Sequence, residues 1–235
     1  MTVIVREARL REAGAVVAAV PFEESVQAAK DELRTAIMRE RTGMSAARRL
    51  AVARGLRDVF LELPQLRHAR HVAVYVSDSG EPGTYLLRQA LVSRGLDVVD
   101  PLIGNSNGLR RLASRDTPPT RPDRDAPANR TRRPRNRHAN RRRLLVAFAP
   151  VVLAPVLLVP ALAVDTCGRR LGRGSGRFDR ILRLLDPATL VLAVVHDGEL
   201  FDCAVESIPE EPHDVRVEAV LTPSRIRYLT NRYSF

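Results

Sequence analysis

The spacing of apolar residues predicts two helices near the start of the chain. One runs from Ser25 to Arg41, where apolar residues recur every three to four positions, and Gly43 ends it. Ser45 is a typical N-cap residue for a second helix, which Pro64 ends. The two segments therefore read as consecutive amphipathic helices.

The pattern then changes from helical spacing to short β-rich runs. His71–Val76 and Leu96–Asp100 are predicted strands, and the segment between them is a predicted helix that Thr84 can cap. A strand, a helix and a strand at this spacing form a βαβ unit. Such a unit implies a parallel sheet with helices on its faces.

Further elements follow in the last third of the chain. Strands are predicted at 156–159, 189–195 and 215–221, with a further short one at 200–205. In the stretch 215–221, apolar residues alternate with Arg216 and Glu218, which is typical of a half-buried strand. Residues 165–176 read as a loop and 178–185 as a short helix.

These elements predict an α/β fold: a single domain with a mainly parallel central sheet flanked by helices, interrupted by an irregular Arg/Pro-rich segment. The domain is expected over residues 25–230. Residues 1–24 form an N-terminal extension to which we assign no role.

The interrupting segment, 104–143, has almost no apolar periodicity, and its composition favours a disordered polycation. Thirteen arginines and three aspartates between residues 110 and 143 give +10 of the chain's total charge of +11. The rest of the chain is nearly neutral. The net charge therefore gives no general argument for binding nucleic acid or membranes.

An uncharged run of 21 residues, 144–164, is long enough to span a membrane. Pro150, Pro155 and Pro160 interrupt it every five residues, and each would break a helix. We therefore expect a buried strand here and no membrane contact. The charged N-terminus does not resemble a signal peptide, and two cysteines, Cys167 and Cys203, are too few for a disulfide framework. A cytoplasmic location is the resulting expectation.

The segment 170–179 carries the clearest candidate chemistry. Its alternating glycines let the backbone turn tightly and bring its N–H groups close to an anion. Arg170, Arg173 and Arg177 add positive charge, and a helix begins directly afterwards. The segment reads either as a phosphate-binding loop or as an exposed glycine-rich turn.

Charged residues elsewhere allow similar alternatives. Lys30 and Arg34 lie four residues apart on one predicted helix face, so they either share an anion or form a solvated face. Asp179 either caps the dipole of the following helix or holds Mg²⁺ beside phosphate. Asp214 is by itself a turn former, and Glu81 lies in a loop after a predicted parallel strand, where α/β proteins bind ligands.

The order of these motifs resembles that of the 5-formyltetrahydrofolate cyclo-ligase family. The chain has Lys-x-x-Leu-Arg at 30–34, an apolar residue and a glutamate five positions apart at Val76 and Glu81, and an apolar strand ending at Pro160. Asp165 follows, then Arg-Leu-Gly-Arg-Gly-x-Gly at 170–176 with Asp179, and Pro-x-x-x-His-Asp at 209–214 before Thr222. The resemblance covers roughly 27–101 and 156–223.

The resemblance implies an enzyme that uses ATP and Mg²⁺ to convert 5-formyltetrahydrofolate into 5,10-methenyltetrahydrofolate, acting as a monomer with no specific nucleic-acid or membrane partner. It implies that Arg173 and Lys30 take part in catalysis, and that Asp179 and Asp214 bind the metal. The folate would contact Val76, Glu81 and residues Arg173, Gly174, Ser175, Gly176 and Arg177. ATP would contact Lys30, Asp31, Glu32, Leu33, Arg34, Arg170, Leu171, Gly172, Arg173, Gly174, Ser175, Gly176, Arg177 and Phe178.

The chain departs from the family in two places. Arg177-Phe178 replaces a tyrosine pair, and 103–155 lacks the family's composition while keeping close to its length. Two other functions therefore stay open: a homologue with a disrupted folate pocket and impaired catalysis, or a nucleic-acid-binding protein that uses the Arg-rich segment. That segment has no aromatic residue for base stacking, which weighs against the second.

We hypothesise that 103–155 is an out-of-frame translation between two compensating frameshifts. Length kept while composition is lost is the result that such a pair produces. The 37 arginines beside one lysine indicate GC-rich coding DNA. Resequencing the locus should recover a middle region resembling the family in another reading frame. Its absence from every frame would exclude the hypothesis.

Overall fold

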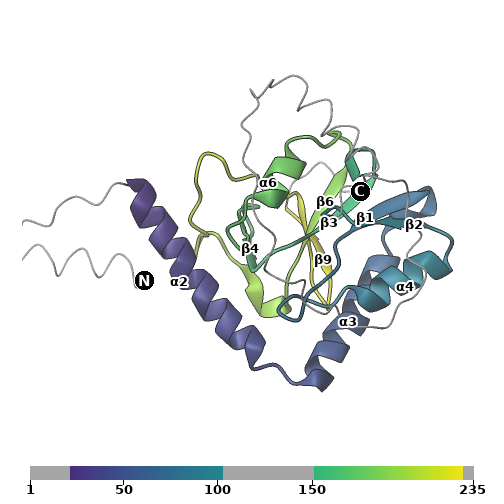
Figure 1. The fold of residues 1–235 in the computed structure, drawn as a ribbon, viewed down its shortest axis with the longest axis horizontal. Coiled ribbons are helices and arrows are strands. Elements are labelled where there is room, and N and C mark those ends of the chain that lie inside the picture. Colours follow the sequence, from purple (N-terminus) through teal and green to yellow (C-terminus); the bar gives the residue numbers. More distant parts are fainter. Residues whose placement is uncertain (1–21, 103–150, 230–235) are drawn as a thin grey trace, which may run out of the picture.

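The computed structural model describes residues 22–102 and 151–229 (Figure 1). Within these ranges it confirms the predicted α/β fold with a mainly parallel central sheet. The Arg-rich segment 104–143 and residues 1–21 of the predicted extension lie outside the described residues.

Two consecutive helices begin the described chain. α2 (Phe22–Thr42) and α3 (Ala46–Leu61) match the predicted pair, although α2 begins three residues before the predicted Ser25. Ser45 is the N-cap of α3, and its hydroxyl accepts a hydrogen bond from the Arg48 amide at 3.2 Å. A short 3₁₀ turn, η2 (Pro64–Arg67), then leads to the sheet.

The central sheet has six strands in the order β2-β1-β3-β6-β8-β9. All neighbouring pairs are parallel except the last, β8 with β9. In chain order the strands are β1 (His71–Val74), β2 (Asp97–Val99), β3 (Val156–Pro160), β6 (Leu190–Val194), β8 (Ala219–Leu221) and β9 (Ile226–Tyr228).

The predicted βαβ unit is present as β1, α4 (Tyr85–Ser93) and β2. Thr84 occupies the N-cap position of α4 but does not cap it as predicted. Its hydroxyl donates instead to the carbonyl of Tyr75 at 2.8 Å, because the chain folds back on itself after β1. Thr84 therefore closes the loop after β1 rather than the first turn of the helix.

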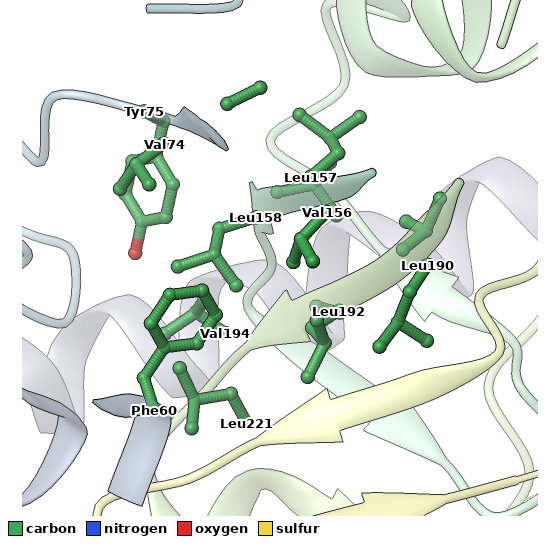
Figure 2. Close-up of a cluster of buried hydrophobic side chains, with 14 of the residues drawn as sticks. Phe60, Val74, Tyr75, Val156, Leu157, Leu158, Leu190, Leu192, Val194 and Leu221 are labelled. Atoms are coloured by element: carbon green, nitrogen blue, oxygen red, sulfur yellow. The ribbon is translucent and has the colours of Figure 1, made fainter. Parts of the chain in front are cut away.

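The core is built around β3 and β6, the two central strands. Residues 156–159 of β3 and all five of β6 are buried, which is typical of parallel strands covered on both faces. Figure 1 shows α3 and α4 together on one side of the sheet and α6 (Arg177–Leu182) on the other. Figure 2 shows Phe60 of α3 packed near Leu158, Val194 and Leu221.

The uncharged run predicted to contain a strand does so at β3. Val151 and Ala154, just before it, also pack in the core. Among the described helices none has both the length and the apolar character needed to cross a membrane.

A second, three-stranded sheet lies beside the first, in the order β5-β4-β7. It consists of β4 (Ala163–Asp165), β5 (Arg170–Leu171) and β7 (Leu200–Phe201). The segment predicted as a loop from 165 to 176 therefore contains a strand, because Ala163 and Val164 pair with Leu171 and Arg170. Ile37 of α2 packs against this small sheet in a separate apolar cluster.

Several predicted elements are shorter than expected, among them the strand predicted over 200–205, which is confined to β7, and the strand predicted over 71–76, which ends at Val74. The strand predicted over 215–221 is confined to β8, because the Val217 amide bonds to the carbonyl of Gly168, outside the central sheet. The helix predicted over 178–185 is α6, which ends at Leu182. A 3₁₀ turn, η3 (Asp197–Glu199), precedes β7.

The two cysteines form one disulfide, Cys167–Cys203, with Cα atoms 5.8 Å apart. Local hydrogen bonds bring the two turns together. The buried carboxylate of Asp165 accepts from the amides of Cys167 and Arg169, and the Thr166 hydroxyl accepts from the Cys203 amide. A pairing of cysteines 36 residues apart was not predicted from their spacing.

Candidate active site

A cavity of about 470 Å³ lies beyond the carboxyl ends of β1 and β3. Tyr75, Val76, Asp78 and Glu81 reach it from the loop after β1. Residues 160–162 reach it from the end of β3, and α2, the glycine-rich loop and the turn 211–214 complete the wall. The cavity therefore combines segments from both halves of the described chain.

The sheet topology explains why the cavity lies there. The chain passes from β1 through α4 to β2 on one side, and from β3 through α6 to β6 on the other. Connections that leave two neighbouring parallel strands in opposite directions open a crevice at their carboxyl ends, where α/β proteins bind ligands. β1 and β3 form this switch point.

One face of α2 lines the cavity with Gln27, Lys30, Arg34 and Arg41. These positions are three, four and seven residues apart, so they share a helix face. The predicted contacts Asp31, Glu32 and Leu33 do not line it: the first two are exposed, and Leu33 packs against the small apolar cluster. The remaining predicted site residues all lie at the cavity wall.

The glycine-rich loop is closed at its base by an ion pair. Arg170 Nη2 lies 2.7 Å from Asp179 Oδ1, and both side chains are largely shielded from solvent. Arg34 of α2 donates to the carbonyl of Gly172 at 2.9 Å. Gly174 and Gly176 have backbone φ angles of 89° and 61°, a region that residues other than glycine rarely adopt. Their alternation gives the loop the curvature of an anion-binding nest.

Arg173, at the exposed tip of the loop, reaches across to the loop after β1. Its guanidinium pairs with the carboxylate of Asp78, with Nη2 and Oδ1 3.0 Å apart, and its Nε lies 3.9 Å from Glu81 Oε1. Arg177 is exposed, and Phe178 is buried in the core. The tip therefore spans the cavity from the glycine side to the Glu81 side.

Glu81 is the more shielded of the two carboxylates that face Arg173. Its Oε2 accepts the amide of Asp78 at 3.1 Å. Burial raises the pKa of Glu81, and the nearby Asp78 charge adds to the rise despite that hydrogen bond. Val76 beside it is 53% exposed, so it offers an open apolar surface to the cavity.

Lys30 is buried and pairs with two carboxylates, which excludes the solvated-face interpretation of its position. Its Nζ lies 2.6 Å from Glu211 Oε2 and 2.5 Å from Asp214 Oδ2. Burial would raise the pKa of Asp214, but the hydrogen bonds from Lys30 and from the Glu211 amide outweigh burial and lower it. Asp214 is therefore held ionised.

Glu211, His213 and Asp214 each offer one possible metal-ligand atom, and the three atoms lie within 4.8 Å of one another. Carboxylate oxygens are the donors that Mg²⁺ prefers, and an imidazole suits it less well. Asp179, the other predicted ligand, lies outside this group, and its Oδ1 accepts from Arg170 and from the Val215 amide. The donor set fits a divalent cation through its carboxylates.

Several residues of the cavity were not predicted: Gln27, Arg41, Tyr75, Asp78, Leu102, Pro160, Ala161, Leu162, Glu211 and His213. The helical phase of Lys30 and Arg34 could have identified Gln27 and Arg41. Proximity to a motif could have identified Asp78 and Glu211. Ala161 and Leu162 had no chemical signal, since they contribute apolar wall and backbone.

Comparison with known proteins shows that the chain is similar to members of one enzyme family. Residues 26–223 match the 5-formyltetrahydrofolate cyclo-ligase family. The chain is 36% identical over 213 residues to the 5-formyltetrahydrofolate cyclo-ligase of Mycolicibacterium smegmatis, covering 83% of this chain and 94% of that protein. It is 38% identical over 78 residues to the mitochondrial 5-formyltetrahydrofolate cyclo-ligase of Arabidopsis thaliana, covering 30% of this chain and 27% of that protein.

Two solved structures share the fold. The 5,10-methenyltetrahydrofolate synthetase of Aquifex aeolicus superposes with a TM-score of 0.59 at 19% identity, covering 88% of this chain and 95% of that chain. The synthetase of Mycoplasma pneumoniae gives a TM-score of 0.54 at 15% identity, covering 82% and 97%. At these identities the superpositions show a common α/β architecture.

We expect Lys30→Met to lower the free energy of unfolding by about 2 kcal/mol at neutral pH. The substitution leaves Glu211 and Asp214 without their cation, and their residual solvent contact keeps the loss below that of a fully buried pair. The pKa of Asp214 is lower in the folded state, so its stabilisation is complete above its unfolded pKa of about 3.9. The difference between variant and parent should therefore shrink as the pH falls below that value.

Urea unfolding at pH 7 and at pH 3.5 measures both effects. Arg57→Met is the matched control, because Arg57 forms an exposed pair with Asp58 away from the cavity and its loss should change neither curve. A Lys30→Met variant as stable as the control would contradict the structural role of Lys30.

Proposed function

Since the chain belongs to the 5-formyltetrahydrofolate cyclo-ligase family, a family of ligases, we propose that it converts 5-formyltetrahydrofolate into 5,10-methenyltetrahydrofolate with ATP and Mg²⁺. The observation that carries the proposal is the cavity between β1 and β3. It brings the cations of α2, the glycine-rich loop and the half-buried Glu81 to one crevice. Each is a feature that this two-substrate reaction requires.

The formyl oxygen is a poor leaving group, so the reaction needs it to be activated. In the proposed sequence the oxygen attacks the γ-phosphorus of ATP, the bond from that phosphorus to the bridging oxygen breaks, and ADP leaves. N10 of the folate then attacks the formyl carbon and loses its proton, and phosphate departs with the former formyl oxygen. Such chemistry depends mainly on positioning and charge neutralisation, and this agrees with a site that relies on cations and backbone amides.

The residues around the glycine-rich loop would hold the triphosphate. Arg34 contacts the loop at Gly172, Arg173 is part of the loop, and Gly174 permits a close approach of its backbone to an anion. Arg173 pairs with Asp78 at the surface, an interaction weak enough to be exchanged for phosphate. We assign to Arg173 the stabilisation of the negative charge that develops on the phosphoryl group during its transfer.

The acidic turn 211–214 would hold Mg²⁺. Asp214, one of the two predicted ligands, and Glu211 fit through their carboxylates, whereas Asp179, the other predicted ligand, pairs with Arg170 and lies outside this group. When bound, the ion neutralises charge on the β- and γ-phosphates. Lys30 keeps Asp214 ionised for this purpose.

The folate would bind on the Glu81 side of the crevice. Glu81 accepts hydrogen bonds from donors on the pterin, and Val76 contributes an exposed apolar contact. Phe178 keeps a ring at one position of the family's tyrosine pair but lacks the hydroxyl, and it is buried in the core. The exposed Arg177 supplies a guanidinium that can stack on an aromatic system.

The direct test is to incubate the purified protein with ATP, Mg²⁺ and 5-formyltetrahydrofolate and to record the absorbance of methenyl-folate. We expect turnover, and a loss of about 10²-fold or more in kcat for Arg173→Ala, since a charge on the transferred phosphoryl group is left unpaired. Arg227→Ala is the control, because Arg227 is exposed on β9 away from the cavity.

Two other results would replace the proposal. ATP binding without product would favour a homologue with impaired catalysis. Salt-sensitive DNA binding in the absence of ATP binding would favour a function of the Arg-rich segment, as phosphate contacts weaken with salt.

The pH dependence of folate use should report on Glu81. Because burial raises the pKa of Glu81, it takes up a proton at a higher pH than an ordinary glutamate, whose pKa is about 4.3. As the pH falls through this raised pKa, kcat/KM for 5-formyltetrahydrofolate should decline. Glu81→Gln should lower kcat/KM and remove this acid limb. If the Glu81→Gln variant kept the acid limb of the kcat/KM profile at the same pH, the limb would belong to another titrating group.

A further inference from the structure

Arg41 lies in the last turn of α2 and is almost completely buried, with 2% of its surface exposed. Its Nε and Nη2 each lie 2.7 Å from an oxygen of Glu199, which is also buried. A bidentate pair of this kind fixes the orientation of the guanidinium plane. Glu199 is fixed in turn, since its Oε2 accepts the His196 amide at 2.7 Å.

The same guanidinium donates to the backbone on both sides of the crevice. Nη1 bonds to the carbonyl of Gly80 at 3.0 Å, in the loop after β1. Nη2 bonds to the carbonyls of Ala161 and Leu162 at 2.8 and 3.3 Å, directly after β3. Glu199 follows β6. The Arg41 side chain therefore joins the segments that follow three adjacent strands, β1, β3 and β6.

Gly80 precedes Glu81, so the bond from Arg41 fixes the backbone that presents this carboxylate. Two further arginines contact this loop from exposed positions: Arg49 donates to the carbonyl of Ser79, and Arg173 pairs with Asp78. Exposed contacts restrain a loop less than a buried guanidinium with four partners. Arg41 is therefore the principal restraint on the loop from α2.

We propose that Arg41, oriented by Glu199, is a positioning residue for Glu81 and the 160–162 wall, and that it sets the affinity for the folate rather than for ATP. The proposal rests on the function proposed above. A lysine in its place would supply a single point charge and could not span Glu199 and the carbonyls together. The position therefore requires the planar fork of arginine.

Removing Arg41 alone would leave Glu199 buried and unpaired, which destabilises the fold. The test variant is therefore Arg41→Met combined with Glu199→Gln, which removes both charges and keeps an acceptor for the His196 amide. We expect the KM for 5-formyltetrahydrofolate to rise by about tenfold or more, and the dissociation constant for ATP to change by less than about threefold. Arg41→Lys should likewise raise the KM for 5-formyltetrahydrofolate without weakening ATP binding. It replaces the double variant in the test if that variant does not fold.

Hydrogen exchange gives a second measurement that needs no substrate. The amides of Gly80 and Glu81 donate to Asp78 and should be protected in the parent. They should lose protection in the variant, while the amides of β6 keep theirs. Arg49→Met is the matched control, and it should leave the KM for folate and the exchange of Gly80 and Glu81 close to those of the parent.

The outcomes separate the two proposals. A parent without turnover contradicts the proposed function, whereas the exchange of Gly80 and Glu81 still tests what Arg41 restrains. Unchanged exchange with an unchanged KM for folate would overturn the role of Arg41. The role would also be overturned if the variant weakened folate binding and ATP binding equally. The same holds if Arg49→Met raised the KM for folate as much as the Arg41 variant.

Discussion

The chain leaves β1 and β3 in opposite directions, and the crevice that this opens determines where every other part of the site lies. Because the two strands are parallel neighbours, the segments after them emerge side by side (Figure 1). The loop after β1 supplies acidic groups, and the segment after β3 supplies an apolar wall and backbone carbonyls. α2 contacts both segments and adds the cations that neither contains.

Buried and exposed ion pairs have different functions in this crevice. Lys30, Arg41 and Arg170 pair with carboxylates out of contact with most of the solvent, where separating the charges is costly. They hold the acidic turn, the loop after β1 and the base of the glycine-rich loop. Arg173 pairs with Asp78 at the surface, where exchange of partners costs little. In the proposed reaction, the buried pairs preserve the geometry and the exposed pair is exchanged for substrate.

Local signals in the sequence predicted most of the fold and the centre of the site. The Ser45 cap, the β1-α4-β2 unit and the glycine-rich loop each depend on residues close together in the chain. Thr84 was misassigned because its competing acceptor, the Tyr75 carbonyl, is created by the tertiary fold of the loop. β5 was missed because two residues carry no periodicity, and its pairing with β4 alone defines it.

The largest omission was the pair of Arg41 and Glu199, which lie 158 residues apart. Neither residue belongs to a motif, and a charged residue in the last turn of a helix usually interacts with the dipole at the surface. Sequence spacing gives the helix face of Arg41, but not what covers that face. The partner follows from the packing of α2 across the ends of three strands, which only the assembled structure supplies.

Lys30 is the single lysine among 38 basic residues, and its surroundings require an ammonium group. One nitrogen atom serves carboxylates from two residues of the same turn, Glu211 and Asp214. A guanidinium would instead match one carboxylate with two parallel bonds, as Arg41 does with Glu199. The compact charge of Lys30 bonds to one oxygen of each carboxylate, Glu211 Oε2 and Asp214 Oδ2. Neither Glu211 Oε1 nor Asp214 Oδ1 is the oxygen that this ammonium group contacts. A lysine at this position therefore balances the charge of the acidic turn through one oxygen of each carboxylate.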